Sequence, residues 1–239
     1  MPQLNYETDE QSLFGTFTPP NFELFEQGLG PLTSNIPEAG AFFRTRPELP
    51  APDIEFHYAP SMFYDEGLTA PHASGYCFGP VVVKPTSRGR VMLRAPLADS
   101  KPRVLCNFLT TEEDRQAMIA GVRMALEIAE QAPLKKVARA AFSVPDDDSD
   151  EAIMRFVKRA AQSVYHPTST CAIGSVVDPQ LRVYGIEGLR VADASVMPTV
   201  TRANTNAATI MIAEKAADLI AERTLEPVTL QEKAEPFPL

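Results

Sequence analysis

The last third of the chain constrains the fold most, because it offers one short buried strand followed by a helix. The run LRVAD at 189–193 is apolar at alternate and adjacent positions and predicts a buried strand, with another short strand near 181–184. An Asn-rich loop then leads into a helix predicted over about 206–222. A single buried strand is not a stable sheet. We therefore expect a βα fragment whose strand finds its hydrogen-bonding neighbours elsewhere.

The middle of the chain predicts an antiparallel sheet with helices. Short β-like runs are separated by Pro, Gly and Ser turns, which is typical of an antiparallel meander. These runs span 41–45, 53–60, 76–85, 90–95 and 103–109. A helix should begin at Thr110 or Thr111, since Thr110-x-x-Glu113 has the form of a capping box, and Pro133 should end it. A second amphipathic helix, burying Ile153 and Phe156, should follow the acidic turn at 146–151.

The expected fold class is therefore α+β, an antiparallel sheet with flanking helices plus the C-terminal βα fragment. Its parts are expected in the following order. Residues 1–40 form an irregular segment with one short helix at 21–27, and residues 41–165 form the sheet and helices. The C-terminal segment spans residues 166–224, and a loose tail spans residues 225–239.

Composition excludes several classes of function. The chain has 22 basic and 31 acidic residues, a net charge of −9, which argues against nucleic acid as a partner. No uninterrupted apolar run reaches bilayer length, so we expect no transmembrane segment. Three cysteines, far apart and without a CxxC spacing, predict a reducing cytoplasm and no disulfide framework: Cys77, Cys106 and Cys171. His166 and Cys171 have no second ligand pair, so no metal site is expected.

His166 is the strongest candidate for chemistry. It lies in the turn Tyr165-His166-Pro167, and the proline keeps His166 out of helical geometry. An imidazole titrates near neutrality and is the usual group for accepting a proton at physiological pH. A histidine in a loop is more often structural, and that alternative remains open on these residues alone.

Polar residues surround the start of the last helix. Asn204 and Asn206 bracket Thr205, and Asn206 is expected to cap the helix while Asn204 points into a pocket. The free N–H groups of a helix N-terminus favour an anion or a polarised carbonyl. Asp193 ends the LRVAD run, and the carboxyl end of a strand is where α/β folds bind ligands such as a ribose hydroxyl.

Together and in order, these residues resemble a known family. The stretch HPTSTCAIGSVVDPQLRVYGIEGLRVADASVMPTVTRANTNAATIMIAEKAADLI, residues 166–220, resembles the C-terminal signature of the glucose–methanol–choline (GMC) family of flavin-dependent alcohol oxidoreductases. GPLTSNIPEAGAFFRT at 30–45 and DIEFHYAP at 53–60 are similar to substrate-domain segments of choline-dehydrogenase-like and alcohol-dehydrogenase-like members. The resemblance covers roughly residues 24–222.

The resemblance implies a role for each candidate residue. His166 matches the histidine that accepts the hydroxyl proton of an alcohol substrate. Asn204 matches the second catalytic position, which hydrogen-bonds the oxygen of the alcohol, and Tyr165 matches a residue that lines the substrate pocket. The remaining matches contact FAD. Asp193 and Ala194 match the strand end that contacts the diphosphate and ribitol region of FAD. Thr205, Asn206 and Ala207 match the backbone edge beside the pyrimidine ring of the flavin. By this resemblance 41–165 is the substrate-binding domain and 166–224 the catalytic, FAD-contacting segment.

The family's ADP-binding core has no match in this chain. A GxG at 28–30 is followed by Pro31 and preceded by no strand, so it fails as a dinucleotide-binding loop. The expected partner is therefore an N-terminal FAD-binding polypeptide that binds most of the FAD, without which the chain is expected to be inactive. The alternative is a truncated relic or interaction module without turnover of its own.

Overall fold

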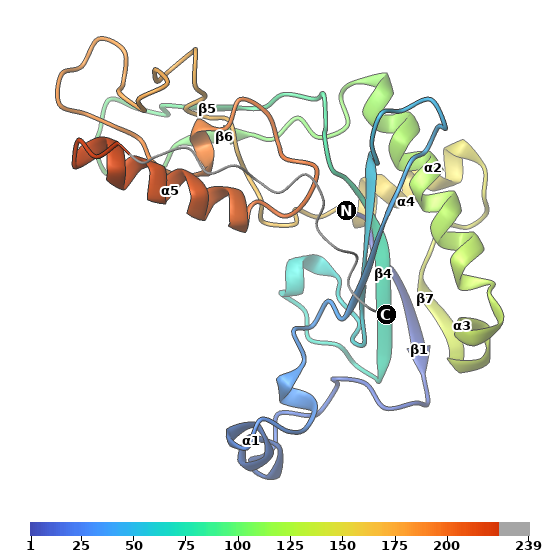
Figure 1. Ribbon diagram of the computed structural model, residues 1–239. Helices are drawn as coiled ribbons and strands as arrows, with labels where there is room; N and C mark the ends of the chain where they lie inside the picture. The colour runs from blue at the N-terminus through green and yellow to red at the C-terminus, as the bar shows by residue number, and fades with distance from the viewer. Residues whose placement is uncertain (225–239) are drawn as a thin grey trace. The chain divides into compact units, whose positions relative to one another are not determined.

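The computed structural model describes residues 1–224, which divide into two compact units (Figure 1). The sheet unit comprises Met1–His166 together with Val200–Asn204. Within the described residues, the C-terminal unit comprises Pro167–Thr199 and residues 205–224. The expected loose tail at 225–239 lies outside the described residues.

A five-stranded antiparallel sheet in the order β2-β3-β4-β1-β7 forms the centre of the sheet unit. Its strands are β1 (Leu4–Thr8), β2 (Ala39–Phe43), β3 (Ile54–Ala59), β4 (Gly75–Val82) and β7 (Ala138–Ser143). The consecutive strands β2, β3 and β4 are the first three runs of the expected meander, but the expected runs at 90–95 and 103–109 do not join them. β5 (Arg90–Met92) and β6 (Arg103–Leu105) pair with each other as a separate ribbon.

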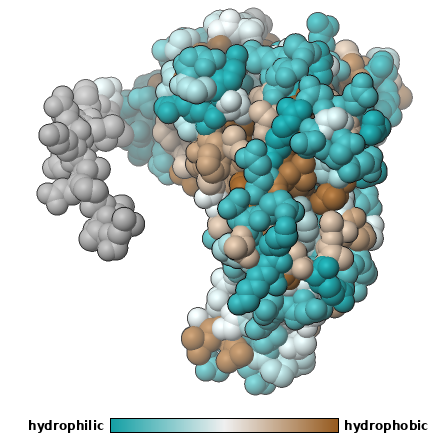
Figure 2. Space-filling model, turned by 90° about the vertical axis from the view of Figure 1, so that its right-hand side faces the viewer, coloured by the Kyte–Doolittle hydropathy of each residue, from teal (hydrophilic) through white to brown (hydrophobic). Residues whose placement is uncertain are grey.

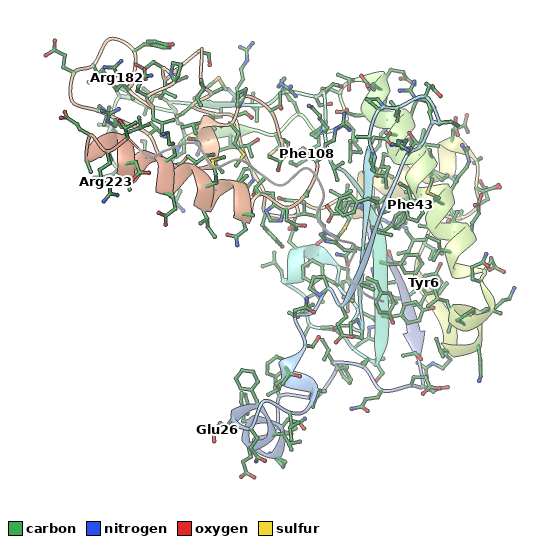
Figure 3. All side chains as sticks on the ribbon, viewed as in Figure 1. Tyr6, Glu26, Phe43, Phe108, Arg182 and Arg223 are labelled. Carbon is green, nitrogen blue, oxygen red and sulfur yellow. The ribbon has the colours of Figure 1, made fainter. Side chains whose placement is uncertain are left out.

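Helices α2 (Glu112–Ala129) and α4 (Asp150–Ala160) supply the apolar side chains that pack against the sheet. Alternate residues of a strand point to the same face of the sheet, so Leu4 and Tyr6 of β1 share one face. Both belong to the core between the sheet and the helices, where Figure 3 labels Tyr6. The core includes Leu4, Tyr6, Ile54, Phe56, Tyr76, Phe78, Val122, Ile153 and Phe156. Hydrophilic side chains cover much of the face seen in Figure 2, as expected for amphipathic helices. The expected α+β class, with an antiparallel sheet and flanking helices, is confirmed.

Shorter helices complete the unit. These are α1 (Pro19–Glu26), α3 (Ala132–Val137) and two 3₁₀ turns, η1 (Pro31–Thr33) and η2 (Asp65–Gly67). α2 ends at Ala129, before Pro133, and Pro133 lies in the first turn of α3, where a proline is tolerated because its missing N–H has no helical acceptor.

The N-terminus of α2 is held by a buried carboxylate. Asp114 accepts hydrogen bonds from Thr86 N (2.8 Å), Thr86 Oγ1 (3.0 Å) and Ser87 N (2.8 Å). The helix cap is Thr111, whose Oγ1 accepts from Asp114 N, so the expected Thr110–Glu113 capping box is wrong. Thr110 is used elsewhere, because its hydroxyl donates to Asn107 O at 3.2 Å.

Residues 1–40 contain the one short helix expected at 21–27, which is α1, but the expectation that the rest is irregular is wrong. β1 lies between β4 and β7 near the middle of the sheet, and Leu4 is fully buried. Only Leu4 and Tyr6 of its five residues are apolar core residues, while Asn5 is a buried amide whose Oδ1 accepts from Phe63 N at 2.8 Å. Strand formation here depends on neighbours more than seventy positions away, such as Phe78 and Ser143, which local sequence does not reveal.

The C-terminal unit contains η3 (Ala194–Val196) and α5 (Asn206–Ile220), packed around Val177, Leu181, Val196 and Ala216. The strands expected at 181–184 and 189–193 are wrong. Val177 with Val183 and Arg182 with Arg190 form only isolated bridges, and Leu189 is 46% exposed. The two segments do pair with each other, since Val183 N donates to Leu189 O at 3.0 Å and Val191 N to Leu181 O at 3.1 Å. This pairing ends after a single bridge and no further strand extends it in the described part of the chain, so neither segment becomes a regular strand.

We predict that Asp114→Asn lowers the free energy of unfolding by about 2–3 kcal/mol, because hydrogen bonds to a buried charged group are lost. Burial alone would raise the pKa of this carboxyl, but hydrogen bonds from Ser87 and Thr86 outweigh it and hold the pKa below 3.8. The stabilisation is therefore present above pH 3.8 and is lost as the pH falls through the folded-state pKa. Urea unfolding at several pH values tests this prediction, with Glu113→Gln at an exposed side chain as the control. A loss of unfolding free energy in Asp114→Asn that is the same at every pH would contradict it.

A second prediction concerns the N-terminal strand. Leu4→Ala should cost about 2–5 kcal/mol, since its side chain is fully buried in the core between the sheet and the helices. Leu68→Ala, at a side chain that is 84% exposed, should cost less than about 0.5 kcal/mol. Equal and small losses for both variants in urea unfolding would mean that β1 is not part of the stable sheet.

Candidate active site

His166 and Asn204 meet in the sheet unit, although 38 positions separate them in the sequence. His166 closes the segment that follows α4, and Asn204 closes the short segment Val200–Asn204 that belongs to the same unit. The distance between Asn204 Nδ2 and His166 Nε2 is 2.9 Å. The structure therefore brings together the two residues expected to carry the chemistry.

This hydrogen bond is compatible with one tautomer of a neutral imidazole. An amide nitrogen can only donate, so His166 Nε2 accepts, and the neutral ring carries its proton on Nδ1. Nε2 thus presents a lone pair, and Asn204 presents an N–H, at the same point. A base and a hydrogen-bond donor so arranged can accept a hydroxyl proton and stabilise the oxygen that loses it.

Neighbouring contacts fix both segments. Arg202 Nη1 donates to Pro52 O at 2.8 Å, which ties the segment carrying Asn204 to a position two residues before β3. Thr201 Oγ1 donates to Ala203 O at 3.0 Å within the same segment. On the other side, Pro167 restricts the backbone of His166.

Tyr165 precedes His166 in a left-handed conformation, with φ of 61°. Its backbone N–H donates to Ser163 Oγ at 2.9 Å, and its hydroxyl donates to Glu66 Oε2 at 2.9 Å. The hydrogen bond to Glu66 raises the pKa of the Tyr165 phenol. Sequence reasoning missed Glu66 altogether, because nothing in the segment 64–68 distinguishes it from an ordinary polar turn.

The residues expected to contact FAD belong to the C-terminal unit. Asp193 caps η3, with Oδ1 accepting from Ser195 N at 2.8 Å, and Ala194 is the first residue of that turn. Thr205 occupies the N-cap position of α5 and is buried, while Asn206 and Ala207 are its first, exposed residues. The expected capping role of Asn206 is therefore wrong, since Asn206 already lies inside the helix.

The donor set at this helix end suits an electron-rich group. α5 has 15 residues and no acidic side chain in its first turn, and the side chain of its N-cap residue makes no capping hydrogen bond. Its positive end favours negative charge on a bound group. The residues present therefore fit the pyrimidine edge of a flavin.

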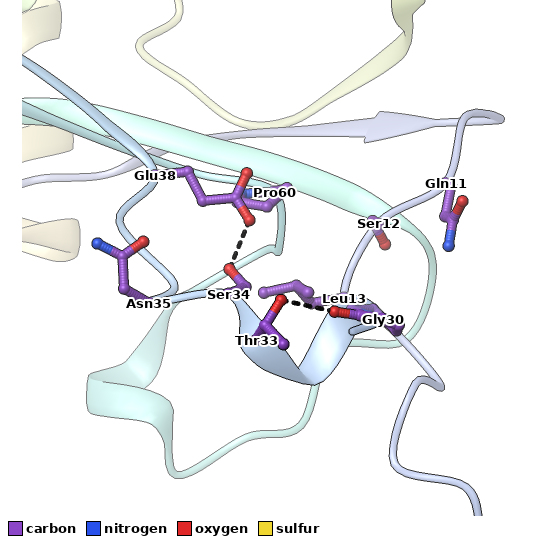
Figure 4. A pocket seen from close by; sticks show the side chains of 10 residues that line it. Gln11, Ser12, Leu13, Gly30, Thr33, Ser34, Asn35, Glu38 and Pro60 are labelled. Atoms are coloured by element: carbon purple, nitrogen blue, oxygen red, sulfur yellow. Dashed lines mark hydrogen bonds between the residues drawn. The ribbon is translucent and has the colours of Figure 1, made fainter. Parts of the chain in front are cut away.

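Residues of the sheet unit line at least two cavities in the described part of the chain. One of about 550 Å³ is lined by Gln3, Tyr64, Glu66, Phe142, Arg159 and Gln162, among others. The other, of about 500 Å³, lies between the loops at 11–13 and 30–38 and contains the hydrogen bonds Ser34–Glu38 and Thr33–Gly30 (Figure 4). Only the first shares residues with the segment leading to His166, and Gln3 Oε1 is buried at its wall without a hydrogen-bond partner.

Residues 1–224 contain no group of three or more His, Cys, Asp or Glu side chains arranged for a metal ion. Within the same range, every helix is too short or too polar to cross a membrane.

Comparison with curated proteins finds relatives over most of the chain. An uncharacterized GMC-type oxidoreductase of Mycobacterium tuberculosis is 43% identical over 91% of this chain and 43% of its own length. The alcohol dehydrogenase [acceptor] of Pseudomonas putida is 38% identical over 81% of the chain and 36% of its own length. Oxygen-dependent choline dehydrogenase of Pseudomonas fluorescens is 38% identical over 82% of the chain and 35% of its own length. The chain thus spans less than half the length of these relatives.

Among solved structures, formate oxidase of Aspergillus oryzae RIB40 matches with a TM-score of 0.81 at 24% identity, over 92% of this chain and 45% of that one. At that identity the match shows a shared fold. A family model described as GMC oxidoreductase matches residues 85–213, more than half of the 239-residue chain. The expected resemblance is confirmed: the chain belongs to the GMC oxidoreductase family.

Proposed function

We propose that this chain carries the substrate-binding and catalytic residues of an FAD-dependent oxidoreductase that oxidises an alcohol to a carbonyl compound. The observation that carries the proposal is the 2.9 Å contact between His166 Nε2 and Asn204 Nδ2. It pairs a proton acceptor with an oxygen-stabilising donor, as alcohol oxidation requires. The family implies FAD as cofactor, and its relatives include an alcohol dehydrogenase and a choline dehydrogenase.

In this proposal the alcohol oxygen lies between the two side chains. His166 Nε2 accepts the hydroxyl proton, and Asn204 Nδ2 donates to the oxygen as negative charge develops on it. Without the alcohol, His166 and Asn204 hydrogen-bond to each other at 2.9 Å. When the alcohol binds, this one hydrogen bond is replaced by two, one between the hydroxyl group and each side chain. When bound, FAD supplies the acceptor for the hydride that leaves the carbon.

Five residues of the C-terminal unit are proposed to hold the cofactor. Asp193 and Ala194 contact its diphosphate and ribitol region, and Thr205, Asn206 and Ala207 contact the flavin edge. The exposed first turn of α5 and its lack of acidic side chains support the second set. The assignment of 41–165 to substrate binding and 166–224 to catalysis and FAD contact is part of the same proposal.

Most of the FAD-binding surface is proposed to come from an N-terminal FAD-binding polypeptide. The exposed apolar side chains of α5, which are unusual on a surface facing only water, support a partner there. They are Ile210, Met211 and Ile220, with 55%, 60% and 63% exposure. The expected cytoplasmic location remains a prediction, consistent with three free thiols in the described residues.

Co-expression with the N-terminal FAD-binding half of a family relative tests the proposed function. We expect alcohol-dependent reduction of an artificial dye, which His166→Ala should lower about 10²–10⁴-fold because the proton acceptor is lost. Asn204→Ala should lower it about 10²–10³-fold, as for loss of one oxyanion donor. His72→Ala, at a histidine bound to Glu7, should leave the rate unchanged.

The chain purified by itself should retain no flavin, and a yellow protein with oxidised-flavin absorbance would contradict this part of the proposal. Absence of dye reduction with every FAD-binding half and a broad panel of alcohols would favour the alternative, a non-catalytic relic or interaction module. A rate unaffected by His166→Ala would exclude the proposed catalytic pair.

A further inference from the structure

We propose that Glu66 is a positioning residue that holds the Tyr165–His166 turn and so directs the imidazole of His166 towards Asn204. The proposal deepens the proposed function and rests on it for its kinetic consequence. Glu66 lies in η2, about 100 positions before His166, and it binds Ser163 and Tyr165. It acts through the residues immediately before His166.

Both carboxylate oxygens of Glu66 are bound by that segment. Ser163 N donates to Oε1 at 3.1 Å, and the Tyr165 hydroxyl donates to Oε2 at 2.9 Å. In the opposite direction, Glu66 N donates to Gln162 Oε1 at 2.7 Å. We call these three hydrogen bonds the Glu66 clamp. They join a turn between β3 and β4 to three of the four residues that precede His166.

The backbone on both sides of the clamp is in a conformation that needs support. Asp65 and Glu66 each have φ of 53°, and Tyr165 has φ of 61°, all in the left-handed region that favours glycine. Non-glycine residues persist there when surrounding contacts over-determine the backbone, and such positions cluster at functional sites. The clamp provides contacts of this kind on both of its sides.

This geometry fixes the backbone position from which the imidazole projects. Tyr165 sets the direction in which the chain enters His166, and Pro167 restricts the conformation of His166 on the other side. With both neighbours held, the ring has little freedom other than rotation of its side chain. The hydrogen bond of Tyr165 to Glu66 raises the pKa of the phenol, so Tyr165 remains a donor in the clamp at neutral pH.

The chain offers a matched control beside Glu66. Asp65 is the preceding residue, shares the left-handed conformation and is also acidic. Its Oδ2 accepts from Thr69 Oγ1 at 2.7 Å, a contact within its own turn. Asp65→Asn therefore removes a neighbouring charge without touching the clamp.

Nitrogen-15 NMR of the full chain tests the clamp without any cofactor. The protein has three histidines, so the ring signals can be assigned by replacing His57 and His72 one at a time. At pH about 8, where imidazole is neutral, the signal of His166 should show the proton on Nδ1. Glu66→Ala should move His166 to a mixture of tautomers, and Asp65→Asn should leave it unchanged.

Tyr165→Phe provides a second, milder test, because it removes only the hydroxyl. It should cause part of the same change, and Glu66→Ala combined with Tyr165→Phe should change His166 no more than Glu66→Ala alone. Such non-additivity is expected of two residues acting through one contact. A His166 signal unaltered in both Glu66→Ala and Tyr165→Phe would overturn the proposal, even if Glu66→Ala were poorly folded, since Tyr165→Phe deletes one atom.

With the FAD-binding half present, Glu66→Ala should lower kcat about 10–10²-fold and change KM for the alcohol little, as for a misplaced catalytic group. Glu66→Gln, whose amide can still bond both Ser163 N and Tyr165 Oη, should restore most of the rate. Equal losses in Glu66→Gln and Glu66→Ala, or a loss confined to KM, would contradict a positioning role. If the unsubstituted chain reduces no dye, the proposed function fails, while the NMR result still decides the clamp.

Discussion

The hydrogen bond between His166 and Asn204 is the contact on which the rest of the site depends. It joins the end of the segment after α4 to a short segment that returns to the sheet unit at Val200–Asn204. Each side has its own anchor in that unit, Pro52 O for Arg202 and Glu66 for Tyr165. Because both anchors are held on the sheet or on loops that leave it, the fold determines the geometry of the pair before any ligand is considered.

Local sequence patterns predict some elements of the sheet unit and miss others. Helical periodicity predicted α2 and α4 because their apolar residues recur on one face and pack against the sheet. The meander of β2, β3 and β4 followed from turn residues between apolar runs. β1 and β7 were missed because each is short and contains few large apolar residues, so pairing with distant strands decides their structure. The run at 189–193 was predicted as a strand from its apolar residues, but in the described part of the chain its pairing with 181–183 stops after a single bridge.

The candidate site was predictable to a similar degree. His166 and Asn204 followed from a histidine held by a proline and an asparagine before a helix, strengthened by the order in which they occur. Glu66 was not predictable, since its role depends on a left-handed turn and on contacts 96 to 99 positions away in the sequence. The helix start was located to within one residue, but Thr205 and not Asn206 occupies the N-cap position.

The central claim is that one alcohol oxygen binds to both members of the pair. The most direct test is a crystal structure of the chain assembled with its FAD-binding half and an alcohol or alcohol analogue. We expect the oxygen within about 2.6–3.2 Å of both His166 Nε2 and Asn204 Nδ2. An oxygen bound by neither side chain, with the imidazole and the amide facing different surroundings, would contradict the account.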